Sequence, residues 1–189
     1  MIPKWNISGV LPPILPGEQG HSPNRSPYKV DLSEVIEQFS TSAERIEILK
    51  GFLKYRQALY SAGITSGFQW LDGSFLENIE VQALRPPNDI DVVTFFNLPD
   101  GVDQKKMFKN HGNLFTPSKT KPQFYVDAYA FILGESTKSH HVKMISYWYS
   151  MWSHRRDGVW KGFIQVDLST CGDDKSHKFL AQIEEEVLS

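Results

Sequence analysis

Two aspartates one residue apart, Asp89 and Asp91, are the residues of this chain best suited to chemistry. They precede Val92, Val93 and Thr94, which favour an extended strand. Because alternate side chains of a strand point to the same face, both carboxylates would lie on one face of a sheet. Neighbouring carboxylates repel each other, and a divalent metal with oxygen ligands commonly offsets that repulsion. The pair therefore predicts a metal site.

A Gly-Ser pair upstream and a third aspartate downstream extend this prediction. Gly73 has no Cβ, so its backbone would approach a phosphate closely, and the Ser74 hydroxyl would donate a hydrogen bond to it. Asp127 is the acidic residue of the apolar segment FYVDAYAF, where an unpaired charge would be costly. On a strand beside Asp89 and Asp91, it would ligate a second metal or accept the proton of an attacking hydroxyl. These residues predict a triphosphate-handling site with two Mg²⁺ ions.

This arrangement resembles the nucleotidyltransferase superfamily that includes DNA polymerase β. The superfamily pattern is a hydrophobic residue with Gly-Ser, then Asp-x-Asp between hydrophobic residues, then a single Asp on a later strand. Here the matching residues are Gly73 with Ser74, Asp89 with Asp91, and Asp127. One departure is the gap of fourteen residues between Ser74 and Asp89, which is longer than the common gap.

Most of the chain also resembles an uncharacterised bacterial family of nucleotidyltransferase-like proteins (DUF6932-like). The segments that carry this second resemblance are FSTSAERIEIL, WLDGSF, PPNDIDVV, VDAY, SYWYSMW and WKGFIQVDL. The superfamily implies an α+β fold, a mixed β-sheet flanked by helices as in polymerase β, with Mg²⁺ at the three aspartates. It implies transfer of a nucleoside monophosphate from a triphosphate such as ATP, with release of pyrophosphate. The expected acceptor is a hydroxyl of a protein, small molecule or RNA end.

Basic residues offer candidate phosphate contacts. Arg85, directly before two prolines, is a candidate nucleotide-binding residue together with Gly73 and Ser74. Two further groups would bind triphosphate or an acidic partner, although surface basic residues are more often simply solvated. These groups are Lys119 with Lys121, and Arg155, Arg156 and Lys161.

Structural roles compete with these assignments. Ser74 followed by Glu77 has the spacing of a helix capping box, which is compatible with phosphate binding at the same helix end. Asp127 would alternatively pair with a core tyrosine or lysine. Asp167 is a rival third carboxylate, but its place near a strand end is explained by exposure.

Hydrophobic periodicity predicts the elements that position these residues. A helix over residues 42–62 is expected to begin with a capping box of Thr41 and Glu44. Residues 112–122 are expected to form a loop, and Trp148 with Trp152 to face the core. The predicted strands are 68–71, 89–96, 123–133 and 162–168, and the other predicted helices are 103–110, 141–152 and 176–188.

Composition places limits on the class of protein. Length fits one domain, expected at residues 31–189, preceded by a proline-rich arm at residues 1–30 that packs on it. Balanced charge, with 20 basic and 22 acidic residues, gives no global signal for nucleic-acid binding. The sequence has no long apolar run and no signal-peptide pattern, and its single cysteine excludes an intrachain disulfide. A cytoplasmic protein without a membrane segment is expected.

A second function remains open from the sequence. The chain would serve as a non-catalytic or regulatory module that keeps the nucleotidyltransferase fold to bind a partner, such as an antitoxin or a phage-defence component, because fold does not fix function. Retention of all three carboxylates favours catalysis. A glycosyltransferase that uses Asp-x-Asp to bind a metal is a weaker alternative, because it leaves the Gly-Ser pair without a role.

Overall fold

The central sheet has the strand order β1-β5-β2-β3-β4 in the computed structural model, which describes residues 1–134 and 137–188. β1 runs parallel to β5 and β3 parallel to β4, whereas β2 is antiparallel to both of its neighbours. The strands are β1 (Tyr28–Lys29), β2 (Gly67–Asp72), β3 (Ile90–Phe96), β4 (Val126–Ile132) and β5 (Ile164–Asp167). The predicted α+β class with a mixed sheet flanked by helices is confirmed.

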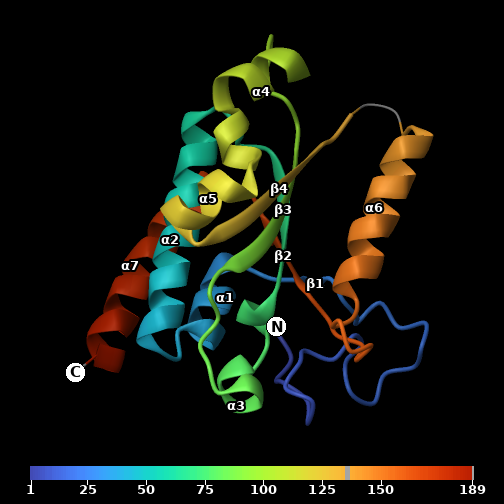
Figure 1. The fold of residues 1–189 in the computed structure, drawn as a ribbon, viewed down its shortest axis with the longest axis vertical. Helices are drawn as coiled ribbons and strands as arrows, with labels where there is room; N and C mark the ends of the chain where they lie inside the picture. The colour runs from blue at the N-terminus through green and yellow to red at the C-terminus, as the bar shows by residue number, and fades with distance from the viewer. Residues whose placement is uncertain (135–136, 189) are drawn as a thin grey trace.

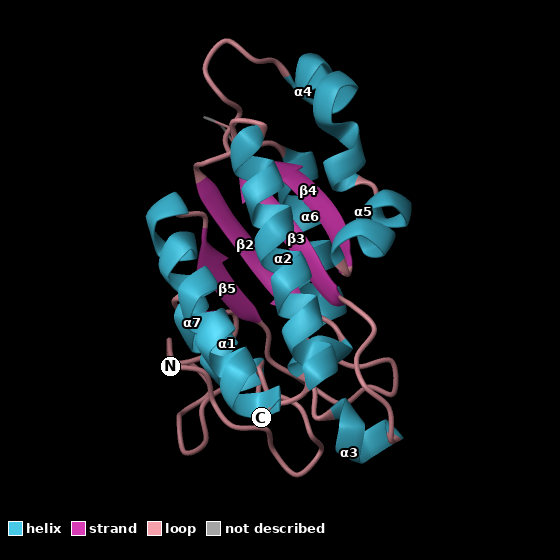
Figure 2. Cartoon of the chain, turned by 90° about the vertical axis from the view of Figure 1, so that its left-hand side faces the viewer, coloured by secondary structure: helices cyan, strands magenta, loops and turns pink. Residues whose placement is uncertain are grey.

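Helices cover the two faces of the sheet unequally. α1, α2 and α7 pack on one face, and α6 is the helix described on the other (Figures 1 and 2). The helices are α1 (Leu32–Phe39), α2 (Ala43–Ser61), α3 (Ile79–Ala83), α4 (Gln104–His111), α5 (Pro117–Phe124), α6 (Ser139–Trp152) and α7 (Thr170–Leu188). The described residues also form two 3-10 turns, η1 (Ser74–Leu76) and η2 (Gly112–Phe115). Within the described residues, no helix combines the length and apolar character needed to cross a membrane.

The predicted long helix is confirmed as α2, but its predicted cap is wrong. Ser42, not Thr41, is the N-cap, and its hydroxyl accepts a hydrogen bond from the Arg45 amide at 3.3 Å. Helical residues begin at Ala43, so only the side chain directly before it lies within reach of the third amide.

The predicted loop at residues 112–122 is also wrong, because it contains η2 and most of α5. Pro117 occupies the first turn of α5, where the missing amide costs nothing, and its fixed φ favours the helix. Phe124 ends α5 and Tyr125 adopts a left-handed conformation, so the strand expected from residue 123 starts only at Val126.

The helix predicted at residues 141–152 is confirmed as α6, but the prediction of its buried face is partly wrong. Trp148 and Trp152 are buried as expected, but Val142 and Ile145 are exposed. Trp148 packs on Tyr129 of β4, with ring centroids 4.6 Å apart. The C-terminal half of α6 therefore supplies its buried contacts.

The N-terminal arm lies along the domain and ends in β1. Val10 and Leu11 are buried, and the Tyr28 hydroxyl donates to the Pro12 carbonyl at 2.6 Å. Near the start of the chain, the Trp5 indole donates to the Leu76 carbonyl at 2.7 Å. The arm thereby contacts η1, next to the candidate phosphate-binding residues.

Candidate active site

Three aspartates form a row across three adjacent strands. Asp72 at the end of β2 pairs in register with Asp91 of β3, and Asp91 pairs in register with Asp127 of β4. Directly paired residues project from the same face, and neighbouring strands lie about 4.8 Å apart. The prediction that Asp127 lies on the strand beside Asp91 is confirmed, whereas Asp72 was not anticipated as a member.

The aspartate row points to the face of the sheet that α6 covers. Trp70, two residues before Asp72, packs on Tyr149 of α6, and Tyr129, two residues after Asp127, packs on Trp148. Side chains two apart in a strand share a face, so the carboxylates share this one. Asp89 lies directly before β3 rather than inside it, which corrects the predicted start of that strand.

A lysine from α5 joins two of the predicted site residues. Lys121 Nζ lies 2.7 Å from Asp127 Oδ2 and 3.0 Å from Asp89 Oδ2. Its hydrogen bond to Asp127, and then that to Asp89, hold the pKa of Lys121 above its ordinary value despite some desolvation. Pairing of Asp127 with a lysine, considered above as a structural role, is therefore present.

A second lysine is buried beneath the row. Lys161 Nζ lies 2.9 Å from Asp72 Oδ1 and 3.1 Å from Glu77 Oε1. Burial lowers the pKa of Lys161, but the carboxylates of Asp72 and Glu77 outweigh it and hold that pKa above its usual value. The expectation that Lys161 belongs to a surface phosphate-binding group is wrong, because its side chain is 7% exposed and already paired.

The two lysines leave the carboxylates incompletely neutralised. Burial, followed by the charges of Asp72, Asp89 and Asp127, raises the pKa of Asp91 to about 7. Burial also raises the pKa of Asp72 to about 6, although Lys161 opposes this shift. An excess of negative charge at a buried position favours binding of a further cation.

Gly73 makes room for the central carboxylate. Its φ is +87°, and a Cβ built on it would collide with Asp91 Oδ2. Gly73 thus permits both the turn out of β2 and the close approach of Asp91. Glu77 bonds to Lys161 with its side chain and to the Ser74 carbonyl with its amide, so the expected Ser74–Glu77 capping box is wrong.

Arg45 supports the first half of the long gap between Ser74 and Asp89, whereas residues 81–86 are exposed. Arg45 of α2 is fully buried and donates to the carbonyls of Phe75 and Glu77, each at 2.6 Å. Its guanidinium also pairs with Glu80 of α3 at 2.5 Å. Arg45 of α2 therefore holds the segment that directly follows Gly73 and Ser74.

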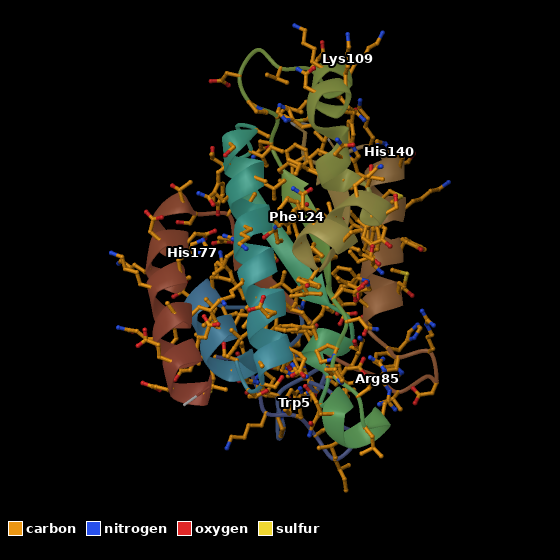
Figure 3. All side chains as sticks on the ribbon, turned by 60° about the vertical axis from the view of Figure 1, so that its left-hand side comes forward. Trp5, Arg85, Lys109, Phe124, His140 and His177 are labelled. Carbon is orange, nitrogen blue, oxygen red and sulfur yellow. The ribbon has the colours of Figure 1, made fainter. Side chains whose placement is uncertain are left out.

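Two other candidates lie away from the row. Arg85 is exposed after α3 and donates to the Pro86 carbonyl at 2.9 Å; Figure 3 shows it at the same end of the molecule as Trp5. Asp167 pairs with Lys29 at 2.9 Å near the other edge of the sheet. Neither residue has a contact with the aspartates among the described interactions.

The donor chemistry of the row suits a hard divalent cation. Carboxylate oxygens are the ligands that Mg²⁺ prefers, and Asp127 Oδ1 is buried without a hydrogen-bond partner among the described residues. As the side chains stand, residues 1–134 and 137–188 contain no group of three or more His, Cys, Asp or Glu that could hold a metal. Lys121 occupies the space between Asp89 and Asp127 instead.

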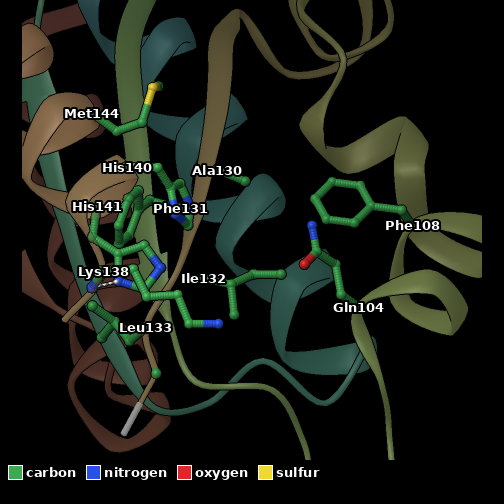
Figure 4. Close-up of a pocket in the computed structure, with 11 residues that line it drawn as sticks. Gln104, Phe108, Ala130, Phe131, Ile132, Leu133, Lys138, His140, His141 and Met144 are labelled. Carbon is green, nitrogen blue, oxygen red and sulfur yellow. Dashed lines mark hydrogen bonds between the residues drawn. The ribbon is translucent and has the colours of Figure 1, made fainter. Parts of the chain in front are cut away.

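A separate cavity of about 390 Å³ lies between α4, the end of β4 and the start of α6 (Figure 4). Phe108 and Gln104 line one side of it, and His140, His141 and Met144 line the other. None of the aspartates lines this cavity, so it is distinct from the candidate site.

Comparisons with known proteins supply a family but no activity. Comparison with curated proteins gave no match, and comparison with solved structures gave none either. A family of unknown function, DUF6932, matches residues 3–167. The chain is therefore a member of the DUF6932 family.

Proposed function

We propose that this protein is a Mg²⁺-dependent nucleotidyltransferase with a polymerase-β-like arrangement of its site. The observation that carries the proposal is the position of Asp91, in register between Asp72 and Asp127 and directly against Gly73. A partly neutralised carboxylate row beside a Gly-Ser turn combines ligands for a cation with hydrogen-bond donors for phosphate oxygens. A triphosphate donor implies a cytoplasmic location.

The residues divide the proposed work between them. Asp89, Asp91 and Asp127 would hold Mg²⁺, which when bound neutralises the phosphate charge that develops during transfer. The turn at Gly73 and Ser74, braced by Arg45, would fix the phosphates. Asp127 would also orient the acceptor hydroxyl or accept its proton. Phosphoryl-group chemistry depends mainly on such positioning and electrostatics.

Incubation with labelled ATP, GTP, CTP and UTP, Mg²⁺ and a cell lysate tests this proposal. Transfer of label to a protein, RNA or small molecule is expected, with loss of transfer in the Asp89→Asn, Asp91→Asn double variant. Asp167→Asn is the matched control, because it changes an aspartate at the end of β5 that pairs with Lys29 outside the row. Absent transfer, or equal transfer in the double variant, overturns the assignment.

A partner-binding module is the second candidate, and α6 favours it. Large apolar and aromatic side chains of α6 remain exposed, which is unusual for a free surface. They are Val142, Met144, Ile145, Tyr147, Tyr149 and Met151. A non-catalytic protein whose carboxylates are held by Lys121 and Lys161 would bind a protein through this helix. A stable copurifying protein lost on Ile145→Lys, without label transfer, would favour it over catalysis.

A further inference from the structure

Lys121 and Lys161 neutralise the aspartates in physically different ways. Lys161 is almost fully buried and is held between Asp72 and Glu77. Lys121 reaches the site from the last turn of α5, and its side chain is 43% exposed. Although the side chains of Asp89 and Asp127 are only 22% and 13% exposed, the Lys121 side chain is open to water and can withdraw into it. Breaking the buried pair of Lys161 and Asp72, in contrast, is costly. Lys121 is therefore the replaceable cation of the site.

We propose that Lys121 is a tethered counter-ion that a divalent metal displaces from Asp89 and Asp127, and that its released ammonium then binds the phosphates of the nucleotide. This inference rests on the proposed function. Both acceptors of Lys121 are residues assigned above as metal ligands, so the ammonium and a metal compete for the same oxygens. Asp127 Oδ1, buried and without a hydrogen-bond partner in the described part of the chain, offers the metal a further oxygen.

Displacement couples metal binding to phosphate binding. A metal alone must break two contacts of Lys121 and leave its ammonium without a carboxylate. A metal that arrives with a polyphosphate gives Lys121 new anionic acceptors, so the two ligands favour each other's binding. Linkage requires this coupling to be equal in both directions. Lys121 would thus prevent tight occupation of the site by metal in the absence of substrate.

Mn²⁺ binding, followed by electron paramagnetic resonance, tests the competition. Lys121→Gln is expected to tighten Mn²⁺ binding about tenfold, whereas Lys109→Gln changes it by less than about twofold. Lys109 is a matched control because it is an exposed lysine in the last turn of another short helix, α4. Inorganic triphosphate is expected to tighten Mn²⁺ binding more in the wild type than in Lys121→Gln. Equal Mn²⁺ affinity in the wild type and Lys121→Gln overturns the inference.

Acylation of lysines by a water-soluble ester, read by mass spectrometry, detects the displacement in the unmodified protein. Saturating Mn²⁺ is expected to increase acylation of Lys121 relative to Lys109, and addition of inorganic triphosphate to decrease it again. Acylation of Lys121 that does not respond to Mn²⁺ contradicts displacement, even if Lys121→Gln fails to fold.

The two proposals fail in different ways. If Asp89→Asn abolishes Mn²⁺ binding but Lys121→Gln leaves it unchanged, the tethered counter-ion is wrong and the metal site stands. If neither the wild type nor Lys121→Gln binds Mn²⁺ through the aspartates, both proposals are overturned.

Discussion

Charged groups are buried on both faces of the sheet, but they are satisfied to very different degrees. Under α2 and α7, Arg56 donates to both carboxylate oxygens of Asp173, at 2.6 and 2.8 Å, and to Gln69 at 2.6 Å. It also donates to the Tyr60 hydroxyl and the Asp167 carbonyl. One cation meets one anion there, and every nitrogen of the guanidinium has an acceptor.

In the described part of the candidate site, on the α6 face, carboxylates outnumber ammonium groups. The acidic residues are Asp72, Glu77, Asp89, Asp91 and Asp127, and the basic ones are Lys121 and Lys161. A balanced network favours the folded state, whereas an unbalanced one destabilises it and favours binding of a cation. The contrast distinguishes a structural cluster from a candidate site, and four measurements test it.

The largest effect is expected in the balanced cluster of Arg56 and Asp173. Arg56→Met should lower the free energy of unfolding by about 3 to 5 kcal/mol, because it leaves the Asp173 carboxylate buried without a cation, although the Tyr60 hydroxyl still donates to it. Lys54→Met, at an exposed position of the same helix, should change it by less than about 0.5 kcal/mol. Urea denaturation measures both, and a similar small cost for the two variants would remove the distinction between the clusters.

At the aspartate row, Gly73→Ala should lower the free energy of unfolding by about 3 kcal/mol. An added Cβ collides with Asp91, and the positive φ is strained for alanine. Gly101→Ala is the control, since Gly101 has a positive φ but no atom within 4 Å of an added Cβ. It should cost only about 1 kcal/mol. Equal costs in thermal denaturation would show that steric contact with Asp91 contributes nothing.

Asp91→Asn should stabilise the metal-free protein, and only at higher pH. Folding raises the pKa of Asp91 from 3.8 to about 7, so the folded state holds a proton that the unfolded chain releases. That contribution to stability is complete below the unfolded pKa and is lost as pH rises through the folded pKa.

In EDTA at about pH 8, the free energy of unfolding of Asp91→Asn should therefore be about 1 to 3 kcal/mol higher than that of the wild type. This difference should shrink toward about pH 4. Urea denaturation across this range measures the effect, with the exposed Asp100→Asn as control. A variant that is less stable than the wild type at about pH 8 would contradict the charge imbalance.

The smallest expected effect is that of added metal. About 10 mM Mg²⁺ should raise the free energy of unfolding of the wild type by about 1.4 kcal/mol if its Kd is near 1 mM. Asp91→Asn should lose most of this gain, while Arg56→Met should retain it, because Arg56 lies on the opposite face. Thermal unfolding with and without Mg²⁺ compares them, and an equal gain in Asp91→Asn would locate metal binding elsewhere.

Local patterns were sufficient to predict α2, α4, α6, the four longer strands and the adjacency of Asp91 and Asp127. Periodicity and β-branched runs act within a few residues of the chain, so one sequence reveals them. α5 was missed because its prolines and lysines are typical of loops, although Pro117 after Thr116 is a known start signal. α1 was missed although Asp31 and Glu34 have the spacing of a helix start signal. The Glu34 carboxylate accepts a hydrogen bond from the Asp31 amide at 3.3 Å.

The missed half of the site depends on distant contacts. Asp72 resembles an ordinary turn residue until β2 pairs with β3 and brings it opposite Asp91. Lys161 is far from Asp72 and Glu77 in the sequence, so its burial follows only from the fold. A sequence signal for Asp72 did exist. It is an aspartate directly before Gly-Ser, at the end of a strand that is expected to pair with the Asp-x-Asp strand.

The contact between Gly73 and Asp91 has a consequence for how the family varies. Because no Cβ fits at position 73 while a carboxylate stands at position 91, position 73 is not free to change unless position 91 changes too. A relative with alanine or serine at position 73 should carry a smaller residue at position 91 and so lack the central carboxylate. Covariation of these two positions would separate members that keep the acidic row from members that have abandoned it.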